Sequence, residues 1–172
     1  MARTGVDEGD FDEKDLALLE YIEDDFDVSL DTLADKLDFS KSAVHYRVKK
    51  LKERGVIEGV TADLNPEPFG LKMVAITEVM VTHEQGYSEN IGTELASLDG
   101  VEQVYYTMGD VDFVAISRVQ NRDQMNEVIE NMVAIEAVNE TSSRFVMDEI
   151  STSPKFMANL SSEMQSNLVD DA

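Results

Sequence analysis

Six basic side chains are gathered in one short stretch of the sequence, residues 41–54. They are Lys41, Arg47, Lys49, Lys50, Lys52 and Arg54, and Glu53 is the acid among them. The stretch therefore carries a charge of +5 in a chain whose formal charge is −22, so the rest of the chain sums to −27. Ammonium and guanidinium groups at this density pair well with phosphate oxygens. The stretch predicts a contact with nucleic acid; the alternative is an ordinary surface helix that Lys and Arg keep solvated.

The sequence lacks the residues that several other kinds of chemistry require. The chain has no cysteine, which excludes disulfides and thiolate metal sites. Its two histidines, His45 and His83, are far apart, so a metal sensor that uses His and carboxylates shows no ligand cluster. No glycine-rich phosphate loop and no nucleophile–base pair is visible. We therefore predict no catalytic residue, no metal and no cofactor.

Two helical patterns precede the basic stretch. Apolar residues recur at three-residue steps from Leu16 to Ile22, behind Asp12, which can cap a helix. They recur at i, i+3, i+4 and i+7 from Leu30 to Leu37, behind Ser29, which is another candidate cap. Both segments are therefore predicted to be amphipathic helices.

The basic stretch itself is predicted to be a third helix. Ser40 can cap its start, and Gly55 fits the left-handed residue that ends many helices. Val44, Val48 and Leu51 form a narrow apolar stripe, so one side packs on the first two helices and the other sides stay polar or basic. A short helix, a short turn and such a helix describe a helix-turn-helix unit.

The hydrophobic period changes after the third helix. Residues 60–64 alternate as a strand, and Pro66, Pro68 and Gly70 then break the pattern, which predicts a hinge strand and a linker. From Met73 on, the patterns predict the order strand, helix, strand, strand, helix, strand. The expected ranges are 73–81, 91–98, 101–108, 113–119, 125–132 and 142–150. This order is that of a ferredoxin-like fold, so the predicted class is α+β, with an N-terminal winged or plain helix-turn-helix domain joined by the hinge to a ferredoxin-like βαββαβ domain.

The acidity of the chain allows two interpretations. It has 36 acids against 14 bases and a pI of about 4.2. An acidic protein built for one partner carries its charge in blocks or tails, whereas adaptation to molar intracellular salt scatters carboxylates over every surface. Here the acids run along the whole chain without a long block, which favours a protein from a salt-adapted organism. We also expect a cytoplasmic protein, because neither a signal peptide nor a membrane-spanning run is visible.

Taken in order, these motifs resemble the leucine-responsive regulator/AsnC (Lrp/AsnC) family of transcription regulators over about residues 10–150. The resemblance is carried by "S-x-S-x-V-x-x-R-V-x-x-L" at 40–51, by "G-V-I-x-G" at 55–59 before a Pro-Gly hinge, and by "GVEQVYYTMGDVDF" at 100–113. There are departures from the family pattern. The chain has "EAVNET" at 136–141, where the family usually shows a Gly-Val pair, and it extends well past Ile150.

The resemblance assigns DNA contacts along the third helix. Side chains near the start of a recognition helix reach base edges in the major groove. The residues predicted to do so are Ser40, Lys41, Ser42, His45, Tyr46 and Lys49. Those predicted to lie against phosphates are Arg47, Lys50, Lys52 and Arg54. Two alternatives stay open: His45 is exposed without a role, and Arg47 forms a structural pair with a carboxylate.

The resemblance also implies a small effector, commonly an amino acid, bound between the second domains. Gly109, Asp110 and Asp112 lie in the loop that helps to line this site in the family. Thr141 and Ser143 follow as candidates, on the expectation that the last strand neighbours the loop. The alternative is a Gly-Asp hairpin with solvated acids.

The resemblance implies homodimers that often assemble into larger homo-oligomers, with double-stranded DNA as partner and no membrane. An enzymatic alternative is tetrapyrrole decarboxylation by the ferredoxin-like domain, as in some Lrp-like proteins. It would need basic groups to hold the substrate's carboxylates, and that domain offers only Lys72, Arg118, Arg122 and Arg144, plus His83, among many acids.

The predicted domains have the following bounds: helix-turn-helix 1–55, hinge 56–71, ferredoxin-like domain 72–150 and C-terminal extension 151–172. The extension is polar with sparse apolar positions, so it is either a helix that docks on a partner subunit or a frayed tail.

Overall fold

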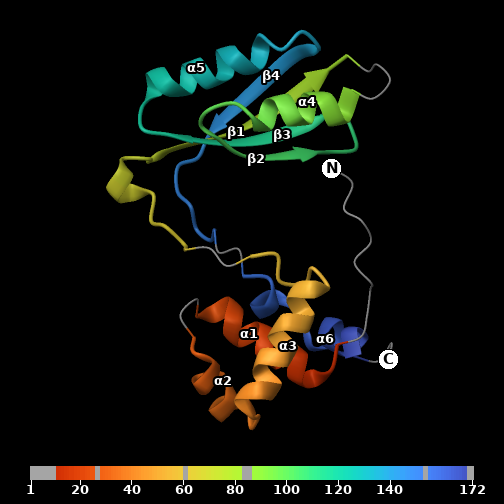
Figure 1. The fold of residues 1–172 in the computed structure, drawn as a ribbon. Helices are drawn as coiled ribbons and strands as arrows, with labels where there is room; N and C mark the ends of the chain where they lie inside the picture. The colour runs from red at the N-terminus through yellow and green to blue at the C-terminus, as the bar shows by residue number, and fades with distance from the viewer. Residues whose placement is uncertain (1–10, 26–27, 60–61, 83–86, 153–154, 170–172) are drawn as a thin grey trace. The chain divides into compact units, whose positions relative to one another are not determined.

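The computed structural model describes residues 11–25, 28–59, 62–82, 87–152 and 155–169, which form two compact units (Figure 1). The described residues up to Asp63 and from Thr152 onward make the first unit, and Leu64–Ser151 make the second. The second unit is thus inserted between two segments of the first. Among the described residues, no helix combines the length and the apolar character that a membrane crossing requires.

The first unit contains the predicted helix-turn-helix, and the predicted caps are present. The Asp12 carboxylate accepts a hydrogen bond from the Asp15 amide (2.7 Å), and the Ser40 hydroxyl accepts one from the Ala43 amide (3.2 Å). Gly55 follows the third helix with φ +72°, the left-handed conformation expected there. The helices are α1 (Glu13–Asp24), α2 (Leu30–Leu37) and α3 (Lys41–Glu53).

The core of this unit also takes up the C-terminal segment. Its buried apolar residues are Leu16, Leu18, Leu19, Leu33, Ala34, Val44, Leu51 and Met157. Met157 belongs to the short 3-10 helix η2 (Met157–Asn159), which is followed by α6 (Ser162–Val169). The extension is helical, as in the first of the two expectations, and in this single chain it packs on α1.

The second unit has the predicted ferredoxin-like order and a four-stranded antiparallel sheet with strand order β2-β3-β1-β4. Its elements are η1 (Glu67–Phe69), β1 (Met73–Val81), α4 (Tyr87–Ala96), β2 (Val101–Tyr106), β3 (Phe113–Val119), α5 (Arg122–Val133) and β4 (Val138–Phe145). The last strand begins and ends earlier than predicted, because its pairing with β1, from Val81↔Val138 to Ala75↔Phe145, sets its limits.

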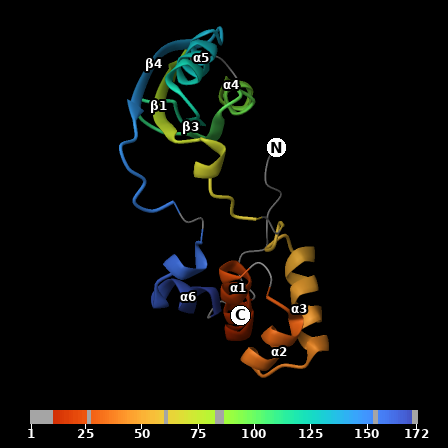
Figure 2. The same cartoon turned by 90° about the vertical axis from the view of Figure 1, so that its left-hand side faces the viewer.

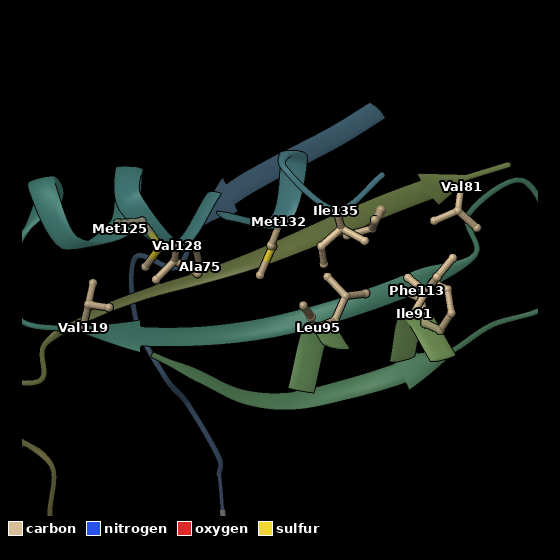
Figure 3. Packing of buried hydrophobic residues seen from close by; sticks show 12 residues of the cluster. Ala75, Val81, Ile91, Leu95, Phe113, Val119, Met125, Val128, Met132 and Ile135 are labelled. Carbon is tan, nitrogen blue, oxygen red and sulfur yellow. The ribbon is translucent and has the colours of Figure 1, made fainter. Parts of the chain in front are cut away.

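Both helices of the second unit pack on one face of the sheet (Figure 3). Ile91 and Leu95 of α4 and Met125 and Met132 of α5 meet side chains such as Phe113 from the strands. Strand side chains alternate between the two faces, so the opposite face carries a second set. That set includes Ile76, Tyr105, Val114 and Ile116, and it is only partly covered: Ile76 is 38% and Tyr105 53% exposed.

The predicted hinge strand is not found in the described part of the hinge. Val60 lies outside the described residues, and residues 62–65 form no strand, with Leu64 67% exposed. An alternating run needs a neighbouring strand to satisfy its backbone groups, and no described strand pairs with residues 62–65. The described residues between α3 and η1 likewise contain no strand that would form a wing.

Candidate nucleic-acid interface and ligand loop

A row of exposed polar side chains runs along one side of α3. At 100° per residue, Lys41, His45, Lys49 and Lys52 fall within an arc of about 80°. All four are exposed, as are Ser42 and Tyr46 on the adjacent arc and Lys50 beyond them. We call Lys41, His45, Lys49 and Lys52 the α3 stripe. Most of the residues predicted to contact DNA thus lie together on the side of α3 that does not pack into the core of the first unit.

The start of α3 combines its cap with a site suited to an anion. The Ser40 hydroxyl caps the helix and lies 3.0 Å from the Ser42 hydroxyl. No acidic residue is present in the first turn of α3, so the positive end of the helix dipole is not neutralised there. Ser40 is therefore placed first as a cap. The exposed Ser42 and Lys41 can reach outward to a phosphate or a base.

Two of the predicted phosphate contacts point the other way, toward α1. Arg47 Nη1 lies 2.6 Å from Asp15 Oδ1 and 2.7 Å from Asp12 Oδ2, and its guanidinium covers the ring of Phe39. These hydrogen bonds outweigh partial burial and raise the pKa of Arg47 above its usual value. Because both carboxylates hold this guanidinium, we withdraw Arg47 from the DNA-contacting set and assign it the structural pairing left open by the sequence.

Arg54 is likewise placed near the core of the first unit. Its guanidinium lies 4.8 Å from the centre of the Phe11 ring and is half-buried. Cation–π contacts of this kind hold the end of α3 against the start of the chain's first helix. We therefore also withdraw Arg54. The aromatic partners Phe11 and Phe39 were missed from sequence, since neither lies on a regular helical pattern.

The ion pairs of the α3 stripe are weak competitors for DNA. Lys41 pairs with Asp31 of α2, and their side chains are 71% and 59% exposed. Lys49 lies 3.6 Å from Glu53, both 65% exposed. Exposed pairs contribute only about 0–1 kcal/mol each, so a phosphate or a base can replace the carboxylate at little cost. Both lysines are therefore available to a ligand.

The loop between β2 and β3 divides its residues into a framework and a rim. Asp112 is buried, and its carboxylate accepts a hydrogen bond from the Val81 amide (2.9 Å), while its own amide donates to Val79 O (3.2 Å). Gly109 has φ +140°, a conformation that favours glycine, and no heavy atom lies within 4 Å of the place a Cβ would occupy. Gly109 and Asp110 are exposed. Asp112 thus holds the loop in its conformation. We call the exposed Gly109 and Asp110 the rim of the loop, and their positions are accessible to a ligand.

We expect Asp112→Ala to lower the free energy of unfolding of the second unit by about 2 kcal/mol, because it leaves the buried Val81 amide without its acceptor. Asp110→Ala removes a carboxylate from the exposed rim and should change it by less than about 0.5 kcal/mol. Chemical denaturation followed by circular dichroism measures both. Equal losses for the two variants would contradict the division into framework and rim.

Thr141 and Ser143 do not adjoin the loop as predicted. The strand order places β1 between β4 and β3, so the premise that the last strand neighbours the loop is wrong. Thr141 pairs with Val79 across the sheet, and the Ser143 hydroxyl lies 2.9 Å from the buried Thr77 hydroxyl. Both side chains point to the helix-covered face, where Ser143 has a structural partner.

Two of the three arginines of the second unit, Arg118 and Arg144, are paired with acids. Arg118 lies 2.7 Å from both Glu102 and Glu149, and Arg144 lies 2.6 Å from Glu78. Such pairs leave few free cations to bind a substrate that carries several carboxylates, which disfavours the decarboxylase alternative. In the part of the chain that the structure describes, no group of three or more His, Cys, Asp or Glu residues could hold a metal ion; His83 lies outside it.

Comparison with known proteins matches both units. The family model of the Lrp/AsnC ligand binding domain matches residues 74–156, and that of a winged helix-turn-helix DNA-binding domain matches residues 11–58. The chain is 30% identical over 138 residues to the HTH-type transcriptional regulator LysM of Sulfurisphaera tokodaii, covering 80% of this chain and 96% of the relative. It is 29% identical over 139 residues to the HTH-type transcriptional regulator FL11 of Pyrococcus furiosus, covering 81% and 91%.

Solved structures agree on the fold. Escherichia coli AsnC superposes with a TM-score of 0.75 at 23% identity, over 83% of this chain and 95% of that one. The complex of the Neisseria meningitidis transcriptional regulator NMB0573 with L-Met superposes with a TM-score of 0.78 at 19% identity, over 84% and 95%. At these identities the likeness supports the shared architecture.

Proposed function

This chain belongs to the Lrp/AsnC family of DNA-binding transcription regulators, and from that premise we propose that it recognises specific double-stranded DNA sites through the α3 stripe. The observation that carries the proposal is the α3 stripe itself, an exposed basic row on a chain whose charge is −22. Lys41, Ser42, His45, Tyr46 and Lys49 would read bases, and Lys50 and Lys52 would lie against phosphates. As a regulator of this family it would act in the cytoplasm, and it needs no catalytic group.

The test is fluorescence anisotropy of the purified protein with the DNA upstream of its own gene, in molar KCl. Saturable binding that a shuffled sequence of the same length does not show is the expected result. Equal binding to both sequences would reject sequence-specific recognition and would reduce the α3 stripe to a general attraction for phosphate.

We further infer that the protein is a homodimer paired through the open face of its sheet. One face is covered by α4 and α5, and the other carries the partly exposed Ile76, Tyr105, Val114 and Ile116. These apolar side chains share their face with the Glu78–Arg144 ion pair; leaving them in water is unfavourable, and a second copy would bury them. Recognition of two half-sites by a dimer also adds avidity, which matters where salt weakens phosphate contacts. The expected dimer is measured by sedimentation, with Ile116→Asp as the disrupting variant.

We infer that the effector is an amino acid held at the rim of the β2–β3 loop. Asp110 suits its ammonium, and backbone amides around Gly109 suit its carboxylate. The Neisseria protein of the same fold is described in complex with L-Met, which supports a ligand of this class. Calorimetric titration with single amino acids tests this. The expected result is binding by one or a few amino acids that Asp110→Ala weakens; no binding by any of them would reject it.

A further inference from the structure

The C-terminal segment is attached to α1 by specific contacts. Met157 is 5% exposed within the core of the first unit, and Leu160, Leu168 and Val169 pack partly buried against the same core. The tightest part is at η2, because a groove of about 410 Å³, lined by Glu13, Ala17 and Gln165 among others, remains between α1 and α6. Met157 is thus the apolar anchor of the segment.

Polar contacts fix the same point. The Glu23 carboxylate accepts hydrogen bonds from the amides of Phe156 (2.9 Å) and Met157 (2.8 Å), which begin η2 and would otherwise lack an acceptor. Beside it, Lys155 Nζ lies 2.9 Å from Asp24 Oδ1. Two carboxylates at the end of α1 therefore hold three consecutive residues of the segment.

The segment covers the side of α1 that faces away from the recognition helix. Glu13, Leu16, Ala17 and Glu20 meet the segment, and they lie on the opposite face of α1 from Asp15, which pairs with Arg47 of α3. Figure 2 shows α1 between α6 and α3. Docking therefore leaves the α3 stripe open to DNA. Most of the docked residues also lie beyond the family match, which ends at residue 156.

The chain leading to this segment is anchored at its other end on the sheet. Both oxygens of Glu149 accept hydrogen bonds from the Arg118 guanidinium (2.7 and 2.9 Å), and the Val146 amide donates to Val74 O (2.9 Å). From Glu149 to Lys155 there are six residue steps, which span at most about 21 Å when fully extended. This connection is therefore short.

The other connection between the two units is almost twice as long. Ile57 still packs on the core of the first unit, and the Phe69 carbonyl accepts a hydrogen bond from Gln120 in the second. The nine residue steps from Ile57 to Pro66 span up to about 31 Å when extended, and the helical η1 adds about 6 Å. With this hinge alone, the distance between the two anchor points could be almost twice the distance that the C-terminal connection permits.

We propose that residues 155–169 form a strap, which docks on α1 of the same chain and almost halves the reach of the DNA-binding unit from the ligand domain. The strap also completes the core of that unit through Met157. Resting on the proposed function, a short reach would narrow the range of half-site spacings that a dimer accepts on DNA. The tests below contain no DNA, so failure of the strap and failure of DNA recognition are distinguishable.

The docking is tested with Met157→Asp in the full-length chain, and Met164→Asp, at a residue 55% exposed in α6, is the matched control. We expect hydrogen exchange at the α1 amides to become at least about 10-fold faster in Met157→Asp and to stay unchanged in the control. Unchanged exchange in Met157→Asp would overturn the docking, as would equal acceleration in both variants.

Whether the segment docks on its own chain is tested by cross-linking. The chain has no cysteine, so an Asp24→Cys/Lys155→Cys variant carries one defined thiol pair per chain. A short bismaleimide should join the two thiols within one chain, which leaves the mass on a denaturing gel at that of a monomer. A linked dimer as the main product would overturn the proposal and assign the segment to a partner subunit.

The reach is tested by lengthening the connection while the docking stays intact. An insertion of about eight Gly and Ser residues after Ser151 adds slack, and the same residues appended after Ala172 serve as control. Spin labels on Asp35→Cys of α2 and Asn126→Cys of α5, both exposed sites, report the distance distribution in chains diluted with unlabelled protein. We expect a distribution almost twice as wide after the insertion and unchanged in the control. Equal widths would overturn the strap.

Discussion

We expect the Lys41→Ala/Lys49→Ala variant to bind its DNA site about 100-fold more weakly than the wild-type protein at the same salt concentration. Each lysine is exposed on the outer side of α3, and its carboxylate partner, Asp31 or Glu53, is exposed as well. Losing one contact to a base or a phosphate costs about 1–3 kcal/mol, and two of them together give the predicted factor. Anisotropy titrations of both proteins on one labelled duplex provide the measurement.

The control removes the same charge elsewhere. Lys72→Ala/Arg122→Ala takes two positive charges from exposed positions of the ligand domain. If the two double variants lose affinity equally, the net charge and not the α3 stripe governs binding, and the predicted site is wrong. The salt dependence separates the roles further, because each lost phosphate contact reduces the slope of log affinity against log salt by about 0.9. A base contact instead changes the preference among sequences.

Much of the fold could be predicted from local signals. Asp12 and Ser40 cap their helices as expected, and β1 and β3 have the predicted bounds, because these elements follow their own hydrophobic period. Leu18, which is fully buried, was missed, since three-residue steps from Leu16 pass over it. Its burial depends on the assembled core of the first unit, which no single helix pattern shows.

The candidate sites were harder to predict because they depend on contacts between distant segments. Arg47 has its basic neighbours along the sequence, yet its partners come from α1. Asp112 and Asp110 look alike in the sequence, and only the reach to the Val81 amide makes one of them a buried framework residue. The C-terminal segment has few apolar positions, so its docking depends on Glu23 and Asp24, more than 130 residues away. Adaptation to molar salt stays a prediction.

Arg47→Ala should lower the free energy of unfolding of the DNA-binding unit by about 2 kcal/mol, because it strands the buried Asp15 carboxylate. This is less than the ~3–5 kcal/mol of a fully buried pair, since the Arg47 side chain is still 26% exposed and water screens part of the interaction. The Asp15→Asn variant should cost a similar amount. In the double variant the two losses should not add, because each change already breaks the same pair.

The pH dependence tests the other ion pair of Arg47, the one with Asp12. Burial acts to raise the pKa of Asp12, but hydrogen bonds from the Asp15 amide and from Arg47 outweigh it and hold this pKa below its ordinary value of 3.8. A carboxyl whose pKa is lower in the folded state stabilises the fold at pH above its unfolded value. That contribution is lost as the pH falls through the folded value. In the Arg47→Ala variant, the free energy of unfolding of this unit should therefore fall less steeply with decreasing pH below about pH 4 than in the wild type.

The same variant decides between the structural and the phosphate-binding roles of Arg47. At a temperature where Arg47→Ala is still folded, a structural residue leaves DNA affinity within about twofold and leaves the salt slope unchanged. A phosphate contact would instead reduce the slope by about 0.9 and leave the free energy of unfolding near that of the wild type. Thermal unfolding and salt-dependent anisotropy on one protein preparation thus give opposite signatures. The second pattern would return Arg47 to the DNA-binding set, because the pairing with Asp12 and Asp15 would then contribute little to the stability of the free protein.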